Sequence, residues 1–180
     1  MYNDNHDGVM TQERPTVATP KEDYKVHKLM IICSKGTIED VYAALIMANG
    51  AVMEGLEASL FFTFFGLDAL VKKRMDHLHT ATVGNPAFMR AVPTIVAGLP
   101  GMETFASTMM MKEMEKLDIP PVSEFLEMIK AGGGKIYGCK LAADMFKLKE
   151  EDLYDDLDGI ITVGQLYEMA EGPGTHFVFI

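Results

Sequence analysis

Residues 135–144 read Lys-Ile-Tyr-Gly-Cys-Lys-Leu-Ala-Ala-Asp, and this stretch decides how the chain folds. A short apolar run leads through Gly138 to Cys139, and a helix-forming run begins at once with Lys140. The pattern predicts a strand, a tight turn and a helix, with a thiol where they join. The positive end of the helix dipole and the neighbouring lysine both favour the thiolate, the nucleophilic form of cysteine. The stretch alone equally allows a buried structural cysteine that packs as a small hydrophobe.

The same order of strand and helix recurs along the chain. Lys28–Cys33 is a continuous apolar run, which is typical of a strand buried on both faces of a parallel sheet. After a turn, Thr37 is placed to N-cap a helix that ends between residues 50 and 55. Further strands are expected at 57–64, 159–163 and 175–180, and further helices at 66–75, 102–117, 147–153, 165–171 and after an N-cap at Ser123. Strands that alternate with helices predict a doubly wound α/β fold on a parallel sheet.

The domain organisation predicted from the sequence is simple. Residues 1–25 are polar without periodicity and predict a flexible N-terminal arm, and residues 26–180 predict a single domain. Prolines and glycines make 76–121 an irregular, partly helical insertion that covers the edge or mouth of the sheet. Its helix is rich in methionine, which fills cores and subunit interfaces and also forms adaptable partner surfaces. The expected apolar face of that helix comprises Met102, Ala106, Met109, Met110 and Leu117.

Composition narrows the choice of partners. The chain has 180 residues and a formal net charge of -10, and an acidic surface repels phosphate backbones, so we expect no nucleic acid partner. The apolar run at 60–65 is too short to span a bilayer, so we expect no membrane partner. Two cysteines without a signal-peptide pattern indicate a reducing, cytoplasmic setting. Acidic residues crowd 150–171, which is typical of a solvated face and leaves open a docking surface for a basic partner.

Reactive groups in open parallel sheets gather at the carboxyl ends of the strands. Cys33 and Cys139 each end a predicted strand, which favours a reactive thiol at Cys139 over a structural one. A lone thiolate without an adjacent histidine base can accept sulfane sulfur as a persulfide and pass it on by exchange. The residues expected to bind substrate around Cys139 are Gly138, Lys140, Ser34, Lys35 and Gly36.

Other chemistries have weaker support in the sequence. Residues 34–37 resemble the end of a phosphate-binding loop but lack its leading glycine, and no dinucleotide fingerprint follows the first strand. His77 and His79 lie in a polar loop without a nearby cysteine or carboxylate pair, which makes them a poor metal site. No C-x-x-C motif supports dithiol chemistry. We therefore expect neither a metal nor a cofactor.

Several stretches together resemble the DsrE/DsrF-like proteins, in the branch often labelled as a peroxiredoxin family. The resemblance covers the chain from about Lys28 to its end, and no peroxiredoxin active-site motif accompanies it. Its most specific motifs are Phe-Phe-Thr-Phe-x-Gly-Leu and Cys-x-x-x-x-Asp-Met. The stretches that carry it are residues 51–55, 61–67, 83–86, 99–102 and 138–140, with Asp144 and Met145.

The resemblance implies a three-layer α/β/α fold of flavodoxin type. Its five-stranded parallel sheet would have the strand order 4-3-2-1-5, and the protein would form homo-oligomers. The resemblance also implies sulfur trafficking with other sulfur-carrier or sulfurtransferase proteins, and the sulfur-binding cysteine of the family corresponds to Cys139. Cys33 has no expected counterpart. In that strand order the two cysteines lie two strands apart, about 9–10 Å, which is too far for a disulfide without movement.

Three functional hypotheses follow. The first is a cytoplasmic sulfurtransferase or persulfide carrier that accepts sulfur on Cys139 and passes it to a partner protein. The second is a non-catalytic binding or assembly subunit of a homo-oligomer, in which Cys139 is structural. The third is a small-molecule or nucleotide binder that uses the loop at 34–37. The sequence leaves open whether the chain catalyses a transfer or only carries sulfur.

Overall fold

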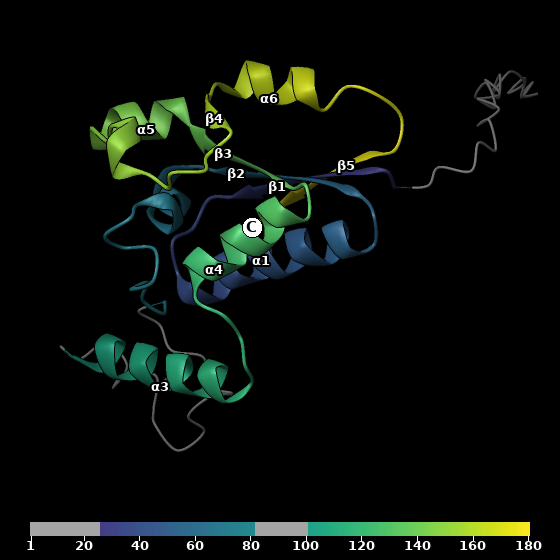
Figure 1. Cartoon of the computed structure of the whole chain (residues 1–180). Coiled ribbons are helices and arrows are strands. Elements are labelled where there is room, and N and C mark those ends of the chain that lie inside the picture. Colours follow the sequence, from purple (N-terminus) through teal and green to yellow (C-terminus); the bar gives the residue numbers. More distant parts are fainter. Residues whose placement is uncertain (1–25, 82–100) are drawn as a thin grey trace, which may run out of the picture.

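The computed structural model describes residues 26–81 and 101–180, and its centre is a parallel sheet of five strands in the order β4-β3-β2-β1-β5. Helices α1 and α4 lie on one side of the sheet, and α5 and α6 lie on the other (Figure 1). The strands are β1 (Lys28–Cys33), β2 (Glu57–Phe62), β3 (Lys135–Cys139), β4 (Gly159–Ile161) and β5 (Thr175–Phe179). The α-helices are α1 (Ile38–Met53), α3 (Met102–Lys116), α4 (Val122–Ala131), α5 (Lys140–Phe146) and α6 (Val163–Met169). The predicted three-layer fold and strand order are confirmed.

Two of the sequence-based expectations on organisation fall partly outside the described residues. The predicted arm at 1–25 lies wholly outside them, and so do residues 82–100 of the predicted insertion at 76–121. The division of the chain into an arm and one domain therefore stays a prediction.

Helix α1 supplies much of the core on its side of the sheet. Val41, Ala44, Leu45 and Ala48 are fully buried, and each buried leucine contributes about 1.5–3 kcal/mol of transfer free energy. The opposite side of α1 keeps Ile46 exposed, so the wide apolar surface predicted for this helix is not fully covered.

The carboxyl edge of the sheet departs from the sequence-based expectation. Strand β2 ends at Phe62, and the short 3₁₀ helix η1 (Phe64–Leu70) replaces the predicted continuation of the strand to 64 and the helix at 66–75. Phe64 has a φ of 44°, a left-handed conformation that a bulky aromatic residue rarely adopts. The turn brings the amide of Gly66 to the carbonyl oxygen of Ser34, 3.1 Å away. The chain therefore folds back over the end of β1 instead of continuing outward.

The predicted helix caps at Ser123 and Thr37 are wrong in their chemistry. Ser123 is the second residue of α4, and its amide and hydroxyl both donate to the carboxylate of Asp76, at 2.9 and 2.8 Å. The N-terminus of α4 is therefore capped by a residue distant in sequence. Thr37 does precede α1, but its hydroxyl donates to Asp40 at 2.6 Å and accepts no amide of the helix.

Helix α3 lies outside the layer formed by α1 and α4 (Figure 1). Its only buried residue is Ser107, whose hydroxyl accepts the amide of Thr80 at 2.9 Å. Met110, Met111 and Met114 pack against the core. Of the apolar face predicted for this helix, Met110 packs against the core, Met102, Ala106 and Met109 are half-buried, and Leu117 is wrong because it is exposed. The helix is rotated so that Ser107 faces the body.

The last third of the chain differs from the prediction mainly in element lengths. The helix predicted at 147–153 is only the 3₁₀ turn η2 (Glu150–Asp152), and β4 is two residues shorter than predicted. Helix α6 begins at Val163 instead of the predicted residue 165, because Thr162 and Gln165 form a capping box. In this box each side chain is hydrogen-bonded to the other residue's amide.

Asp158 joins three elements immediately before β4. Its carboxylate accepts hydrogen bonds from Lys130 of α4 at 2.7 Å, from Lys135 at 3.2 Å and from the amide of Ile136 at 2.8 Å. Partial burial alone would raise its pKa, but these three donors outweigh burial and hold the pKa of Asp158 below its ordinary value. One carboxylate thus fixes α4, β3 and the start of β4 together.

We expect Gly36→Ala and Gly66→Ala each to lower the free energy of unfolding by about 1–3 kcal/mol. A methyl group on Gly36 would collide with the carbonyl oxygen of Phe65, and one on Gly66 would collide with that of Cys33. Gly50→Ala is the matched control, because nothing lies within 4 Å of its Cβ position in α1, and it should stabilise by about 0.5–1 kcal/mol. Urea denaturation of the three variants provides the comparison. Equal stabilities would contradict this close packing.

Asp158 should make stability depend on acid pH. A carboxyl whose pKa is lower in the folded state stabilises the fold above its unfolded pKa of about 4, and this contribution is lost as pH falls through the folded pKa. Asp158→Asn should remove that part of the pH dependence and lower the melting temperature at neutral pH. Asp155→Asn, at an exposed ion pair with Lys72, should change little. Thermal melts between neutral pH and about pH 3 would measure both, and parallel profiles for the wild type and Asp158→Asn would refute the assignment.

Candidate functional site

Cys139 lies at the junction that the sequence indicated. It is the last residue of β3 and the N-cap residue of α5, and its thiol is free. Only 4% of the residue is exposed, so any reagent must approach the sulfur through a narrow opening.

The register of the sheet shows which face the Cys139 side chain occupies. Tyr167 of α6 packs against Phe177 of β5 with ring centroids 6.3 Å apart, so Phe177 points to the α6 side. Alternate residues of a strand share a face, and residues paired across parallel strands point the same way. The row on this face passes through Phe179, Ile32, Phe61 and Tyr137. Cys139 is two residues beyond the last of these, so its side chain points to the face that α5 and α6 cover.

Cys33 points the other way. It follows Ile32 in β1, so its side chain lies on the face covered by α1 and α4, where it is completely buried. Its sulfur is 3.4 Å from the carbonyl oxygen of Lys35. Burial raises the pKa of Cys33 to about 12, despite the opposing effect of that hydrogen bond. Both cysteines end their strands at the same edge, as predicted, but their side chains lie on opposite faces of the sheet.

Gly138 and Lys140, the two neighbours of Cys139, each make a contact that stabilises the fold. A Cβ atom on Gly138 would come within 3.3 Å of Leu67, so the glycine permits close packing of η1 on β3. The ammonium group of Lys140 pairs with Asp144 one turn later, at 3.2 Å. Lys140 therefore shares its charge with a carboxylate, and roles for Gly138 and Lys140 in substrate binding stay predictions.

Among the residues that the structure describes, no hydrogen bond or ion pair joins the predicted loop at 34–37 to Cys139. The Ser34 hydroxyl donates to the carbonyl of Ile180 at 2.9 Å, which ties the loop to the C-terminal strand. Lys35 pairs with Asp40 at 3.2 Å. Lys35 and Gly36 line a hollow of about 740 Å³, and Cys139 is not among the described residues that line it. Substrate binding by Ser34, Lys35 and Gly36 therefore stays a prediction.

Exposed apolar side chains on the same face as Cys139 were not anticipated from the sequence. Leu141 and Met145 of α5 are 70% and 51% exposed, and Phe65 of η1 is exposed with its ring 6.0 Å from that of Phe146. Farther across the α5/α6 side, further apolar residues are exposed because both helices are only seven residues long: Val163, Tyr167, Phe177 and Phe179. We call the six exposed residues of α5, α6 and β5 among these the α5/α6 apolar surface. Phe65 lies at its boundary, because it also lines the hollow beside the loop at 34–37. The sequence signal that could have predicted this exposure was the shortness of the helices that follow β3 and β4.

The described ranges offer no preformed metal centre. Within residues 26–81 and 101–180, no group of three or more histidine, cysteine, aspartate or glutamate residues is arranged to hold a metal ion. No helix in this part of the chain is both long and apolar enough to cross a membrane.

Comparisons with known sequences match most of the chain to one family of proteins. The profile of the DsrE/DsrF/DrsH-like family matches residues 25–175. The sulfur carrier protein DsrE2 of Allochromatium vinosum is 29% identical over 137 residues, which cover 73% of this chain and 85% of that protein. The uncharacterized protein YrkE of Bacillus subtilis is 28% identical over 153 residues, which cover 82% of this chain and 94% of that protein.

Solved structures show the same fold at low identity. The ychN protein of E. coli superimposes with a TM-score of 0.53 at 14% identity, covering 86% of this chain and 100% of that one. A protein of unknown function from Methanobacterium thermoautotrophicum gives a TM-score of 0.53 at 8% identity, covering 86% of this chain and 99% of that one. These likenesses concern the fold alone.

Proposed function

The chain belongs to the DsrE/DsrF/DrsH-like family, and from this membership we propose that it is a sulfur carrier that accepts sulfane sulfur on Cys139. The observation that carries the proposal is the free thiol of Cys139 at the carboxyl end of β3, on the incompletely covered α5/α6 face. The similarity to a protein named as a sulfur carrier supports the same chemistry.

The proposed transfer consists of two thiol exchange steps. The Cys139 thiolate attacks the outer sulfur of a donor persulfide, a new S–S bond forms, and the donor leaves as a thiolate that takes up the proton. A thiolate of the acceptor then attacks the outer sulfur of the Cys139 persulfide, that S–S bond breaks, and the Cys139 thiolate returns. Sulfur moves without net oxidation or reduction, so neither step calls for a metal or a cofactor.

The structure favours Cys139 over Cys33 as the carrier. Cys33 is completely buried, and its raised pKa leaves it as the thiol at neutral pH. Cys139 also has little exposure, but it adjoins the exposed side chains of Leu141 and Met145 in the following helix. A partner that displaces or packs against these side chains would reach the sulfur.

We also propose that copies of the chain assemble through the α5/α6 apolar surface. Exposed apolar side chains that gather on one face are typical of interaction sites, and Phe177 and Phe179 of β5 lie on an edge strand of the sheet. A protein that exchanges sulfur through a free thiolate needs a reducing compartment, and a cytoplasmic location stays part of this proposal. Other sulfur-carrier or sulfurtransferase proteins are the proposed donors and acceptors.

The alternative is a non-catalytic assembly subunit in which Cys139 is structural. The low exposure of Cys139 is the observation that favours it. The two functions differ in whether Cys139 gains and loses sulfur.

Incubation with a polysulfide at neutral pH should add about 32 Da, one sulfur atom, to the wild-type protein. Cys139→Ser should abolish this mass gain, whereas Cys33→Ser should retain it because Cys33 is buried and protonated. Intact-protein mass spectrometry measures the adduct, and addition of a small thiol should remove it by exchange. An unmodified wild type, or an adduct that persists in Cys139→Ser, would support the structural alternative.

Phe179→Asp should weaken self-association, because the side chain is 72% exposed and a buried carboxylate at an interface is costly. Sedimentation velocity should show more monomer than in the wild type, with the dissociation constant of the oligomer raised at least about tenfold. Phe105→Asp is the matched control, since Phe105 is an exposed aromatic residue on α3, and it should leave the oligomer intact. A wild type that sediments as a monomer would contradict the assembly.

A further inference from the structure

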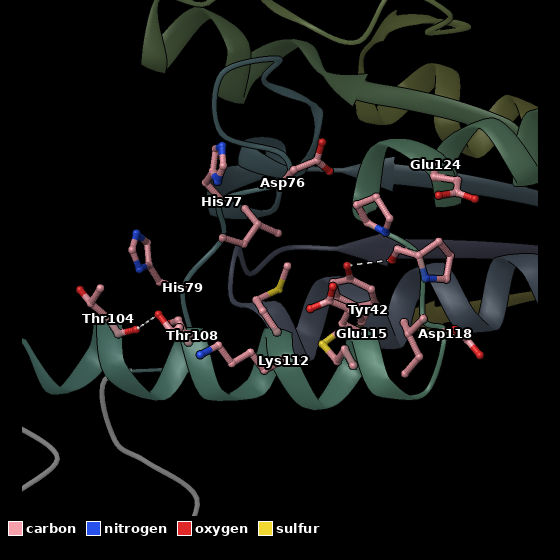
Figure 2. A pocket seen from close by; sticks show the side chains of 17 residues that line it. Tyr42, Asp76, His77, His79, Thr104, Thr108, Lys112, Glu115, Asp118 and Glu124 are labelled. Carbon is pink, nitrogen blue, oxygen red and sulfur yellow. Dashed lines mark hydrogen bonds between the residues drawn. The ribbon is translucent and has the colours of Figure 1, made fainter.

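A cleft separates α3 from the body of the protein, on the side of the sheet opposite to Cys139. Figure 2 shows it between α3 and a wall formed by the segment after η1, by Tyr42 of α1 and by the start of α4. Its volume is about 680 Å³. We call this hollow the α3 cleft. The hydrogen bond from the Thr80 amide to Ser107 holds one end of α3 to the body, and that from the Tyr42 hydroxyl to the carbonyl of Pro120, at 3.0 Å, holds the other.

The floor of the α3 cleft is apolar. Leu78 lies on the body side, Met111 and Met114 come from α3, and Ile119 comes from the turn after it. Unbranched methionine side chains adapt to the shape of what they contact, so this floor suits varied apolar side chains.

The α3 cleft continues into the hollow beside the loop at 34–37. His77, Leu78 and His79 line both spaces, whose volumes are about 680 and 740 Å³. Jointly they form a trough that is larger than a small-molecule site, which usually occupies about 300–1,000 Å³. Such a trough suits an extended stretch of polypeptide.

Charge is unevenly distributed along this trough. At the end near α4, Glu115, Asp118 and Glu124 line the α3 cleft with Lys112 as the opposing charge, and Figure 2 labels all four. Among residues 26–81 and 101–180, none of these three carboxylates forms an ion pair.

At the other end of the trough the charges are balanced. Arg74 pairs with Asp68 at 2.9 Å, and Lys35 pairs with Asp40 at 3.2 Å. The negative potential is therefore concentrated at the α4 end, in a chain whose formal net charge is already -10.

We propose that the α3 cleft binds an extended, apolar segment of a partner protein that carries lysine or arginine near one end. The apolar residues would lie on the methionine floor, and the basic end would lie beside Glu115, Asp118 and Glu124. This surface is separate from the α5/α6 apolar surface, because α1, α4 and the sheet stand between them (Figure 1). A partner bound in the cleft therefore leaves Cys139 accessible.

The test uses two fluorescein-labelled peptides that differ only in charge. One has two lysines followed by alternating leucine and serine, and the other has glutamates in place of the lysines. Fluorescence anisotropy with the full-length protein should show binding of the basic peptide at least about tenfold tighter than that of the acidic one. The difference should shrink as salt rises from about 0.01 to 0.15 M.

Variants of equal charge change locate the binding. Glu115→Lys with Asp118→Asn should weaken the basic peptide about tenfold, and asparagine suits the left-handed backbone at Asp118. Glu168→Lys with Glu171→Gln, at exposed positions in and after α6, is the matched control and should change affinity less than about twofold. Hydrogen exchange of the wild-type protein, which depends on no variant, should show protection at residues 76–79 and 107–119.

Three results would overturn the proposal. Equal weakening by the two double variants would mean that only the overall charge matters. Protection confined to β5 and α6 would place the peptide on the α5/α6 apolar surface. Dissociation of an oligomer by Glu115→Lys with Asp118→Asn, but not by Phe179→Asp, would assign the cleft to a second copy of the chain.

Discussion

The alternation of side chains across the parallel sheet decides where each thiol of this protein lies. Cys33 pairs with Phe62, and Phe62 pairs with Gly138, so these three residues share one face. Cys139 follows Gly138 by a single residue and must point to the other face. A shift of one residue in the pairing of β2 with β3 would bury Cys139 beneath α1 and α4. The chemistry proposed for the chain therefore depends on the register of its central strands.

The contacts of Gly36 and Gly66 hold this edge of the sheet closed around Cys33. The backbone of η1 lies so close to the end of β1 that neither glycine has room for a side chain. Phe64, held at a φ of 44°, is the strained residue where the chain leaves β2 to make that contact. Its energetic cost, of order 1–3 kcal/mol, is offset by the packing of Leu67 and Leu70, which are completely buried. The same turn leaves Phe64 and Phe65 exposed, with the ring of Phe65 6.0 Å from that of Phe146 in α5.

The two sides of the sheet carry different kinds of surface. Helices α5 and α6 have seven residues each, so the side of Cys139 keeps apolar side chains exposed. The longer α1 and α4 cover their face well, and the α3 cleft lies outside them with an acidic rim. The proposed assembly through the apolar surface next to the thiol and the proposed partner binding in the trough on the other side would therefore use separate places on the protein.

Much of this arrangement could be predicted from the amino-acid sequence. Local patterns determined the strands, most helices and the junction at Cys139, because a continuous apolar run or a strand followed by a helix start depends on neighbouring residues. The strand order and the assignment of Cys139 as the sulfur-binding cysteine came from the resemblance to a family. The end of β2 was misplaced because the residues at 63–65 favour a strand by composition, while contacts with β1 force them into a turn.

What only the tertiary structure decided involves residues far apart in the chain. Asp76 caps α4 in place of the predicted Ser123, since its carboxylate accepts hydrogen bonds from both the amide and the hydroxyl of Ser123. The rotation of α3, the α3 cleft and the ion pairs that neutralise Lys35 and Lys140 likewise follow from packing. The sequence by itself determined which elements form and where a thiol ends a strand. The opposite orientations of Cys33 and Cys139 were decided by strand register, which depends on hydrogen bonds between segments that local patterns do not relate.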